Sequence, residues 1–352
     1  YSSYVRMNTD FPLRKFRARH DPATRAVGYG KAMMVFHQLE RMVGEDRFFQ
    51  SLRRLMREFR FRKASWKDVL GVFEAECGVN LRAFHAMWVE RQGAPVLRLE
   101  KADIQKAGER FILRFQIRQE GDPYTLDVPV LLKTEEKDIL QTFRLTRSLE
   151  TFEISSAAHP VRLEVDPEHH LFRRLYPEEI PPSIGKVFGD EKQVLVVPGS
   201  GPSGPREACG EAARIINRTG TGVIREDTDM TPEEMDRASV ILIGSASTSP
   251  QIQPFLKSVF RDPPWEKKRG ESARAARVLV LDHPKSHEHA VMILTGGEKA
   301  DLPAIARKLP HYGKYSYLLF DGDVNVAKGI WEVESSPLIL SWAPPSRKSR
   351  AP

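Results

Sequence analysis

The sequence predicts a multidomain α+β protein: an α-helical subdomain, a small antiparallel β-sandwich, and a C-terminal α/β domain with a mainly parallel sheet. Three observations predict this order. Apolar residues recur at helical spacing in the first quarter of the chain, alternate with polar residues in the next, and then return in short runs between helical stretches. We place the boundaries at residues 1–92 for the helical subdomain, 93–185 for the β-sandwich and its linker, 186–343 for a Rossmann-like α/β domain, and 344–352 for a disordered tail.

Four helices with short connections are expected in residues 1–92, which together make a helical subdomain. Gly44 supplies a C-cap to the first, because glycine accepts the backbone conformation that ends a helix. Ser65 and Asp68 have nearly the spacing of a capping box and predict the start of the third. The helices are expected at residues 25–43, 45–59, from 65 onward, and 81–90.

From Pro95 to about Val165 the hydrophobic period changes from 3.6 to 2. Leu97 and Leu99, for example, alternate with charged neighbours, which is the pattern of a strand with one buried face. Several short strands at this spacing indicate an antiparallel sandwich, and the stretch from Phe172 to Ser183 looks like the linker that leaves it. The strands are expected at residues 97–100, 113–118, 124–132, 139–145, 149–154 and 161–165.

In the third segment, strands and helices alternate, which favours β-α-β units, a mainly parallel sheet and helices on both faces. The strands are expected at residues 194–197, 222–225, 239–243, 277–281, 290–294 and 315–320. The helices are expected at residues 207–216, 232–237, 251–260 and 302–309. Asp321-Gly322-Asp323 lacks the other ligand positions of an EF-hand and is interpreted as a turn.

The composition is that of a soluble globular protein, with 41% hydrophobic and 29% charged residues. No apolar run reaches the length of a membrane span. Residues 1–92 contain 18 Lys and Arg and 10 Asp and Glu, so this segment alone accounts for the net charge of +7 of the chain. Phe59 and Phe61 lie among the basic residues of this region, but no nucleic-acid motif surrounds them, so we expect a solvated face or a protein interface and no nucleic acid.

Cys77 and Cys209 fall in different segments, so no disulfide or structural zinc is expected. The compartment, cytoplasm or periplasm, stays open.

One stretch, Val27 to Phe36, places Tyr29 two residues before Lys31 at the start of an amphipathic helix. Four further motifs follow it in a fixed order: Gly44-Glu45-Asp46-Arg47-Phe48-Phe49, Ala64-Ser65-Trp66-Lys67-Asp68, Phe84-His85-Ala86-Met87-Trp88-Val89 and Gly93-Ala94-Pro95-Val96. In this order and at these distances the motifs resemble the M1 zinc aminopeptidases, or gluzincins. The resemblance implies that residues 1–92 are the helical end of a gluzincin catalytic domain, followed by the β-sandwich. This sequence has Ala32 where the family commonly has glycine.

The resemblance also implies that Tyr29 is the catalytic phenol that polarises the scissile carbonyl. A tyrosine hydroxyl suits this role because it is a fixed donor for the negative charge that grows on the carbonyl oxygen. Gly28 and Gly30, which flank Tyr29, are expected to leave room for backbone or substrate.

The same family needs a His-Glu-x-x-His helix and a further glutamate upstream of this tyrosine, and only 28 residues precede Tyr29 here. We therefore expect a C-terminal portion of a larger aminopeptidase that removes N-terminal residues from peptides. Its zinc ligands, general base and amine-binding glutamates are expected in an upstream half. This chain is expected to bind no zinc and to be inactive alone. His283, His287, His289, His169 and His170 lack the zincin pattern and are expected on the surface.

Gly199, Gly201 and Gly204 have the G-x-G-x-x-G spacing of a dinucleotide-binding loop, after a strand and before a helix. Pro202 and Pro205 remove backbone donors from this loop, so an ordinary strand-to-helix connection is the competing interpretation. Two alternatives to the peptidase stay open: a non-catalytic M1-like scaffold, and a nucleotide-binding α/β module. A third is that the α/β domain serves oligomerisation or docking, with the Pro263-Pro264-Trp265 loop as an anchor.

Overall fold

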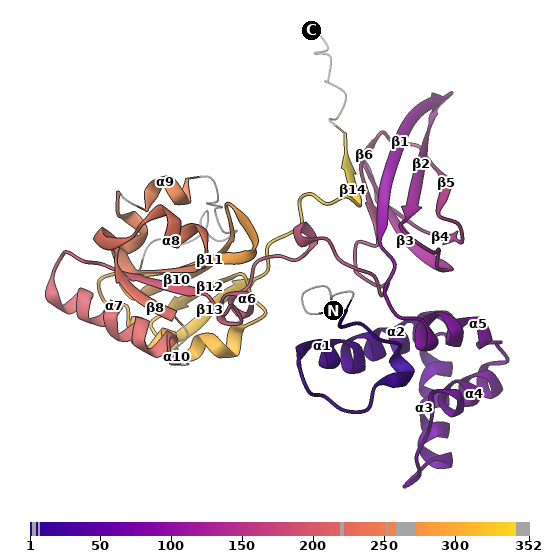
Figure 1. The fold of residues 1–352 in the computed structure, drawn as a ribbon. Helices are drawn as coiled ribbons and strands as arrows, with labels where there is room; N and C mark the ends of the chain where they lie inside the picture. The colour runs from indigo at the N-terminus through magenta and orange to yellow at the C-terminus, as the bar shows by residue number, and fades with distance from the viewer. Residues whose placement is uncertain (2–4, 6–7, 219–221, 251, 258–271, 343–352) are drawn as a thin grey trace, which may run out of the picture. The chain divides into compact units, whose positions relative to one another are not determined.

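The computed structural model describes residues 1–352 except 2–4, 6–7, 219–221, 251, 258–271 and 343–352 (Figure 1). The chain divides into two compact units. The first, here called the N-terminal unit, comprises residues 1–176 and 335–352. The second, the α/β unit, comprises residues 177–334. The expected tail at 344–352 and the docking loop at Pro263–Trp265 lie outside the described residues, as does part of the helix expected at 251–260.

The helical part of the N-terminal unit follows the predicted order. Gly44, at a φ of 84°, separates α2 from α3, and Ser65 and Asp68 make both hydrogen bonds of a capping box at the start of α4, as expected. The elements are η1 (Leu13–Lys15), α1 (Pro22–Arg25), η2 (Ala26–Lys31), α2 (Ala32–Val43), α3 (Glu45–Glu58), α4 (Trp66–Cys77), α5 (Arg82–His85) and η3 (Ala86–Glu90).

Two antiparallel sheets form the sandwich of the same unit, in the orders β1-β2-β5 and β14-β6-β3-β4. The strands are β1 (Leu97–Ala107), β2 (Arg110–Gln119), β3 (Leu126–Thr134), β4 (Ile139–Leu145), β5 (Leu149–Ser156), β6 (Pro160–Val165) and β14 (Ile339–Ser341). We expected the α/β segment to continue to residue 343. Instead the chain returns after Glu334, since β14 pairs with β6 and Leu338 is buried in the core of the N-terminal unit.

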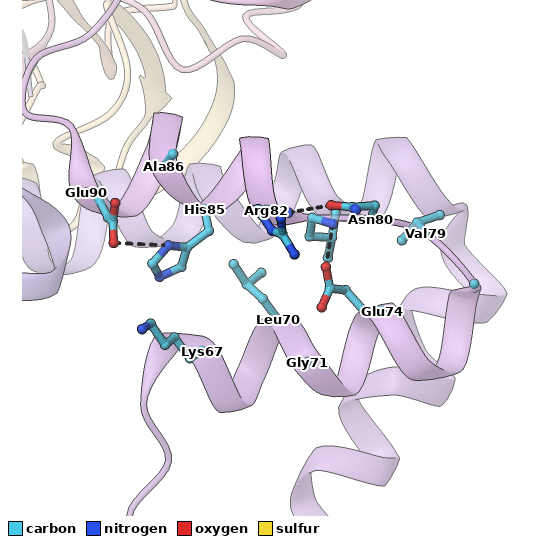
Figure 2. Close-up of a pocket in the computed structure, with 12 residues that line it drawn as sticks. Lys67, Leu70, Gly71, Glu74, Val79, Asn80, Arg82, His85, Ala86 and Glu90 are labelled. Atoms are coloured by element: carbon cyan, nitrogen blue, oxygen red, sulfur yellow. Dashed lines mark hydrogen bonds and ion pairs between the residues drawn. The ribbon is translucent and has the colours of Figure 1, made fainter.

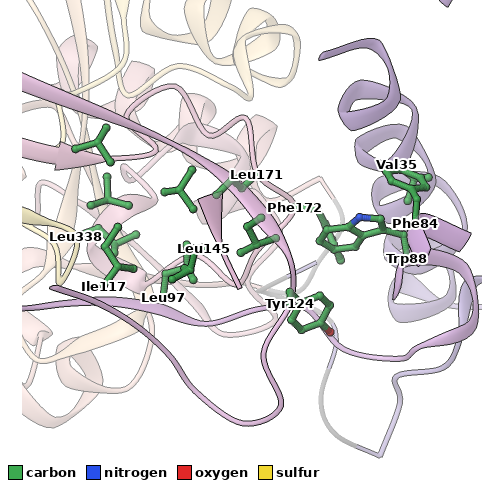
Figure 3. Packing of buried hydrophobic residues seen from close by; sticks show 14 of the residues in the cluster. Val35, Phe84, Trp88, Leu97, Ile117, Tyr124, Leu145, Leu171, Phe172 and Leu338 are labelled. Carbon is green, nitrogen blue, oxygen red and sulfur yellow. The ribbon is translucent and has the colours of Figure 1, made fainter. Parts of the chain in front are cut away.

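One hydrophobic core joins the helices to the sandwich (Figure 3). Trp88 is 1% exposed, stacks on Tyr124 with ring centroids 5.3 Å apart, and meets Phe172 edge-on at 5.9 Å. Aromatic pairs of this geometry add to the free energy of burial. Because this core spans both the helical segment and the sandwich, which we predicted as separate domains, the two form one compact unit.

The α/β unit contains a seven-stranded sheet in the order β13-β12-β10-β11-β9-β7-β8. The strands β8, β7, β9 and β11 are parallel, and β11, β10, β12 and β13 are antiparallel. The multidomain α+β class is thus confirmed. The sheet contains more antiparallel pairs than expected, because the β10–β11 and β12–β13 hairpins were not predicted. The strands are β7 (Gln193–Val197), β8 (Gly222–Glu226), β9 (Ser239–Ile243), β10 (Ala275–His283), β11 (Ser286–Gly296), β12 (Tyr317–Asp321) and β13 (Val324–Gly329).

Helices cover both faces of this sheet, as the β-α-β pattern predicts. Leu195 and Ile241 pack in the cluster that includes α6, α7 and α10, while their neighbours Val194 and Val240 pack in the cluster that includes α8 and α9. The helices are α6 (Ile184–Phe188), α7 (Ser203–Ile216), α8 (Pro232–Asp236), α9 (Gln253–Leu256) and α10 (Leu302–Lys308), with short turns η4 (Pro177–Glu179), η5 (Asp227–Asp229), η6 (Gly244–Thr248) and η7 (Leu309–Tyr312). The turn expected at Gly322 joins β12 to β13, with a φ of 60°. Among the helices that the structure describes, none combines the length and apolar character that a membrane crossing requires.

Candidate functional site

Tyr29 lies in η2, a π-helical turn between α1 and α2. Turns of this kind are rare and occur often at functional sites. Asp21 caps the preceding helix by accepting a hydrogen bond from the Thr24 backbone at 2.8 Å. The Tyr29 side chain is 60% exposed, and its hydroxyl makes no hydrogen bond to any group that the structure describes. The turn therefore presents a phenol that is free to donate.

The two glycines beside Tyr29 have different surroundings. A Cβ on Gly28 would overlap the ring of Phe16, which also contacts the Tyr29 ring edge-on at a centroid distance of 5.7 Å. Only Gly30 faces open space, with no described atom within 4 Å of a Cβ placed there. The room that we expected on both sides of Tyr29 is thus present on one side, and on the other Phe16 holds the ring.

A groove of about 840 Å³ opens beside Tyr29. Arg25 precedes Tyr29 by one helical turn, and Arg19 and His20 come from the connection before α1. The full lining consists of Tyr1, Arg19, His20, Asp21, Pro22, Arg25, Ala26, Tyr29, Gly30 and Met33. An uncommitted hydroxyl in a groove that cationic side chains also line can stabilise negative charge that develops on a bound group.

Lys31 is fully buried and anchors the helix that carries Tyr29. Its ammonium donates to the carbonyl oxygens of Arg91 at 2.9 Å and of Gly93 at 3.2 Å. The Gly93 backbone in turn donates to a carboxylate oxygen of Asp10 at 2.6 Å. Lys31 thus joins two of the motifs that carried the resemblance, the one around Tyr29 and the one beginning at Gly93. This role of Lys31 was not predicted from the sequence, although Lys31 stands four residues from both Val27 and Val35 on the apolar face of the helix.

Burial lowers the pKa of Lys31 to about 8, and the attraction of Asp10 opposes this only in part. A lysine whose folded pKa is depressed contributes stability above its unfolded pKa and loses it as the pH falls through the folded pKa. We expect the free energy of unfolding, relative to a Lys31→Met variant, to rise by about 3 kcal/mol between pH 8 and pH 10.5. Urea titrations at several pH values would measure this rise. The free energy of unfolding of the wild type relative to a Lys101→Met variant, which lacks an exposed lysine, should show no such rise. Equal behaviour of the two comparisons would contradict the assignment.

A second groove, of about 770 Å³, lies between α4 and the α5–η3 segment (Figure 2). Its polar groups mostly hold the helices together. Glu74 accepts a hydrogen bond from the Leu81 backbone at 2.7 Å, and His85 pairs with Glu90 at 3.5 Å. Because these carboxylates already have partners, we assign this groove no chemistry.

The glycine loop of the α/β unit follows β7, where the order of the parallel strands reverses. Gly199 donates its backbone N–H to Asp227 at 2.8 Å, and a Cβ on Gly199 would lie 2.9 Å from a carboxylate oxygen of Glu226. Gly201 has a φ of 112°, and Gly204 lies in the first turn of α7. Two carboxylates therefore stand where a phosphate would need backbone donors, which disfavours an anion in this loop.

The expectation that the histidines lie on the surface is wrong for His283. It is 5% exposed, with Nε2 2.8 Å from the Met235 carbonyl oxygen. The side chain of His289 is 13% exposed, and its Nδ1 lies 2.7 Å from Asp190. His170 contacts His37 through ring nitrogens 3.0 Å apart. Nowhere in the described part of the chain do three His, Cys, Asp or Glu side chains gather as a metal site would require.

No family model matches the chain. Over 95 residues the chain is 33% identical to aminopeptidase N of Streptomyces lividans. Part of this chain resembles an aminopeptidase. The match covers 27% of this chain and 11% of that protein, so the chain spans about a tenth of the length of the curated relative that it matches.

Among solved structures, the chain is similar to the crystal structure of Legionella pneumophila aminopeptidase A in complex with aspartic acid. The TM-score is 0.37 and the identity 13%, over 66% of this chain and 27% of that one.

Proposed function

We propose that this chain is the C-terminal portion of an M1-type zinc aminopeptidase in which Tyr29 stabilises the tetrahedral oxyanion. The observation that carries the proposal is the unbonded Tyr29 hydroxyl on a π-helical turn, exposed to a groove and held by Phe16. The identity to aminopeptidase N over 95 residues supports a peptidase.

The chemistry follows from the growth of charge during attack on a peptide carbonyl. Negative charge moves onto the carbonyl oxygen, and a fixed donor at that point lowers the barrier more than it strengthens substrate binding. A phenol ordinarily keeps its proton near neutral pH and can donate it in a hydrogen bond. Arg25, in the same groove, adds positive potential. Phe16 limits the movement of the Tyr29 ring, so the donor needs little reorganisation.

The described residues do not offer a catalytic zinc ion a set of ligands, because no three His, Cys, Asp or Glu side chains lie together among them. We propose that the zinc ligands, the general-base glutamate and the glutamates that bind the substrate's amine belong to an upstream half of the parent protein. In this proposal the upstream half and peptide substrates are the partners of the chain, and the chain alone hydrolyses nothing.

The test joins the native upstream segment to this chain and measures hydrolysis of aminoacyl-p-nitroanilides together with zinc content. The longer protein should bind zinc and turn over substrate, while residues 1–352 should do neither. Turnover and stoichiometric zinc in the isolated chain would overturn the proposal. A longer protein that binds zinc but hydrolyses no substrate would favour the non-catalytic scaffold.

The nucleotide-binding alternative makes a separate prediction. Because Asp227 occupies the Gly199 donor and Glu226 stands beside it, we expect NAD and ATP at millimolar concentration to leave the melting temperature unchanged. A ligand that binds only the folded state raises that temperature. A concentration-dependent rise with either nucleotide, lost in a Gly199→Asp variant, would reinstate the alternative.

A further inference from the structure

A basic and apolar surface lies at the end of α3 and the turn that follows it. We call it the basic tip and define it by Phe49, Arg53, Met56, Arg57, Arg60 and Phe61. Figure 1 shows this end of α3 at the far end of the helical part from the sandwich sheets. Nothing in the proposed peptidase site uses it, since the Tyr29 groove is lined by other residues.

The apolar side chains of the basic tip are unusually exposed. Phe61 is 95% exposed, Met56 69% and Phe49 43%. Phe49 and Met56 are seven residues apart on α3 and so lie on one face of the helix. Large apolar side chains gathered on one surface mark an interaction site more often than single exposed ones do.

The backbone of Phe61 is also strained. Its φ is 59°, in the left-handed region that bulky residues rarely adopt. Burial of the Phe61 side chain does not compensate for this strain, because almost all of the side chain faces solvent. A strained residue that adds nothing to the core is better explained by a contact outside the chain than by stability.

The arginines of the basic tip have no acidic partners in the part of the chain that the structure describes. No ion pair joins Arg53, Arg57 or Arg60 to an acidic residue that the structure describes. Glu58, the acidic side chain nearest along the helix, is bonded to Arg54 at 2.7 Å. The guanidinium of Arg60 lies 5.1 Å from the centroid of the Phe61 ring, so a positive charge lies directly beside the exposed ring.

We propose that the basic tip binds the surface of an anionic lipid bilayer. Phe61 and Met56 enter the boundary between headgroups and acyl chains, and the arginines contact lipid phosphates. This combination of inserted apolar groups and flanking cations is how peripheral helices bind such membranes. Single-stranded nucleic acid is the weaker candidate, because it requires a row of flat aromatic platforms, whereas Met56 offers no ring.

The test is flotation of the 352-residue chain with vesicles of phosphatidylcholine alone or with about 30% phosphatidylserine. We expect binding to the anionic vesicles that weakens as salt rises. A Met56→Ser/Phe61→Ser variant and an Arg57→Glu/Arg60→Glu variant should each bind about tenfold or more weakly. Leu140→Ser, which removes a side chain on β4 that is 64% exposed, and Lys101→Glu are the matched controls and should bind normally.

A Phe61→Gly variant separates binding from folding. Glycine accepts the left-handed backbone, so this variant should melt at a higher temperature than the wild type and still float less. The proposal is overturned if the wild type ignores the anionic vesicles, or if the tip variants and the controls bind alike. It is also overturned if a single-stranded oligonucleotide binds and the anionic vesicles do not.

Discussion

In the longer protein, Tyr29→Phe should lower kcat by about 10²- to 10³-fold and leave KM nearly unchanged. The substitution removes only the hydroxyl, so the ring can keep its edge-on contact with Phe16. A donor that acts mainly on the developing oxyanion affects kcat and kcat/KM alike. Steady-state kinetics with an aminoacyl-p-nitroanilide would measure both constants.

Tyr1→Phe is the matched control for this experiment. Tyr1 lines the same groove, but its hydroxyl already donates to Asp10 at 2.7 Å. We expect this variant to keep the wild-type kcat. Full activity of Tyr29→Phe would show that Tyr29 is a packing residue and would remove the central assignment.

The largest expected effect on stability comes from Arg173→Met, which should lower the free energy of unfolding by about 3–5 kcal/mol at neutral pH. The Arg173 guanidinium lies 2.8 Å from Asp166, and neither side chain is exposed to solvent. Without Arg173 the Asp166 carboxylate would be a buried charge with no counter-charge. The backbone N–H of Leu171 donates to this carboxylate at 3.2 Å, but it carries no charge to balance that of Asp166.

This destabilisation should shrink as the pH falls. Burial raises the pKa of Asp166, and the charge of Arg173 opposes the rise. In Arg173→Met the opposing charge is gone, so the pKa rises further. A carboxyl with a raised folded pKa stabilises the fold when protonated and loses that contribution as the pH rises through the folded pKa. The difference between variant and wild type should therefore be smaller at pH 5 than at pH 7.5 in denaturant titrations.

An exposed ion pair of similar geometry provides the comparison. Arg144 and Asp127 lie 2.7 Å apart, with side chains 59% and 55% exposed. Solvent screens such pairs, so Arg144→Met should lower the free energy of unfolding by less than about 1 kcal/mol. If the two variants lose the same stability, burial does not strengthen the Asp166–Arg173 pair relative to the exposed pair.

Local rules predicted much of the fold. The capping box at Ser65 and the break at Gly44 depend on residues within one turn, and both were found as expected. The return of Leu338 to the sandwich was not predictable, because it depends on a strand about 175 residues earlier in the chain. The β10–β11 hairpin was missed since two apolar strands with a short polar connection do not reveal whether they run parallel or antiparallel.

The candidate site likewise has some features that local sequence patterns predict and others that depend on the folded chain. The position of Tyr29 at the start of an amphipathic helix could be predicted from spacing. The packing of Phe16 over Gly28 could not, because those residues meet only in the folded chain. Lys31 gave a local signal, a lysine on an apolar helix face, but its acceptors at Arg91 and Gly93 lie 60 residues away or more.

The pairing of β14 with β6 has a consequence for synthesis on the ribosome. β6 ends at Val165, and its partner begins only at Ile339, after the whole α/β unit. At 5–20 residues per second, roughly 10 to 35 s pass before the pairing can form. During that time one edge of β6 offers unpaired backbone groups to other nascent chains, which is the usual route to aggregation of a sheet. Truncation before residue 339 would make this temporary exposure permanent.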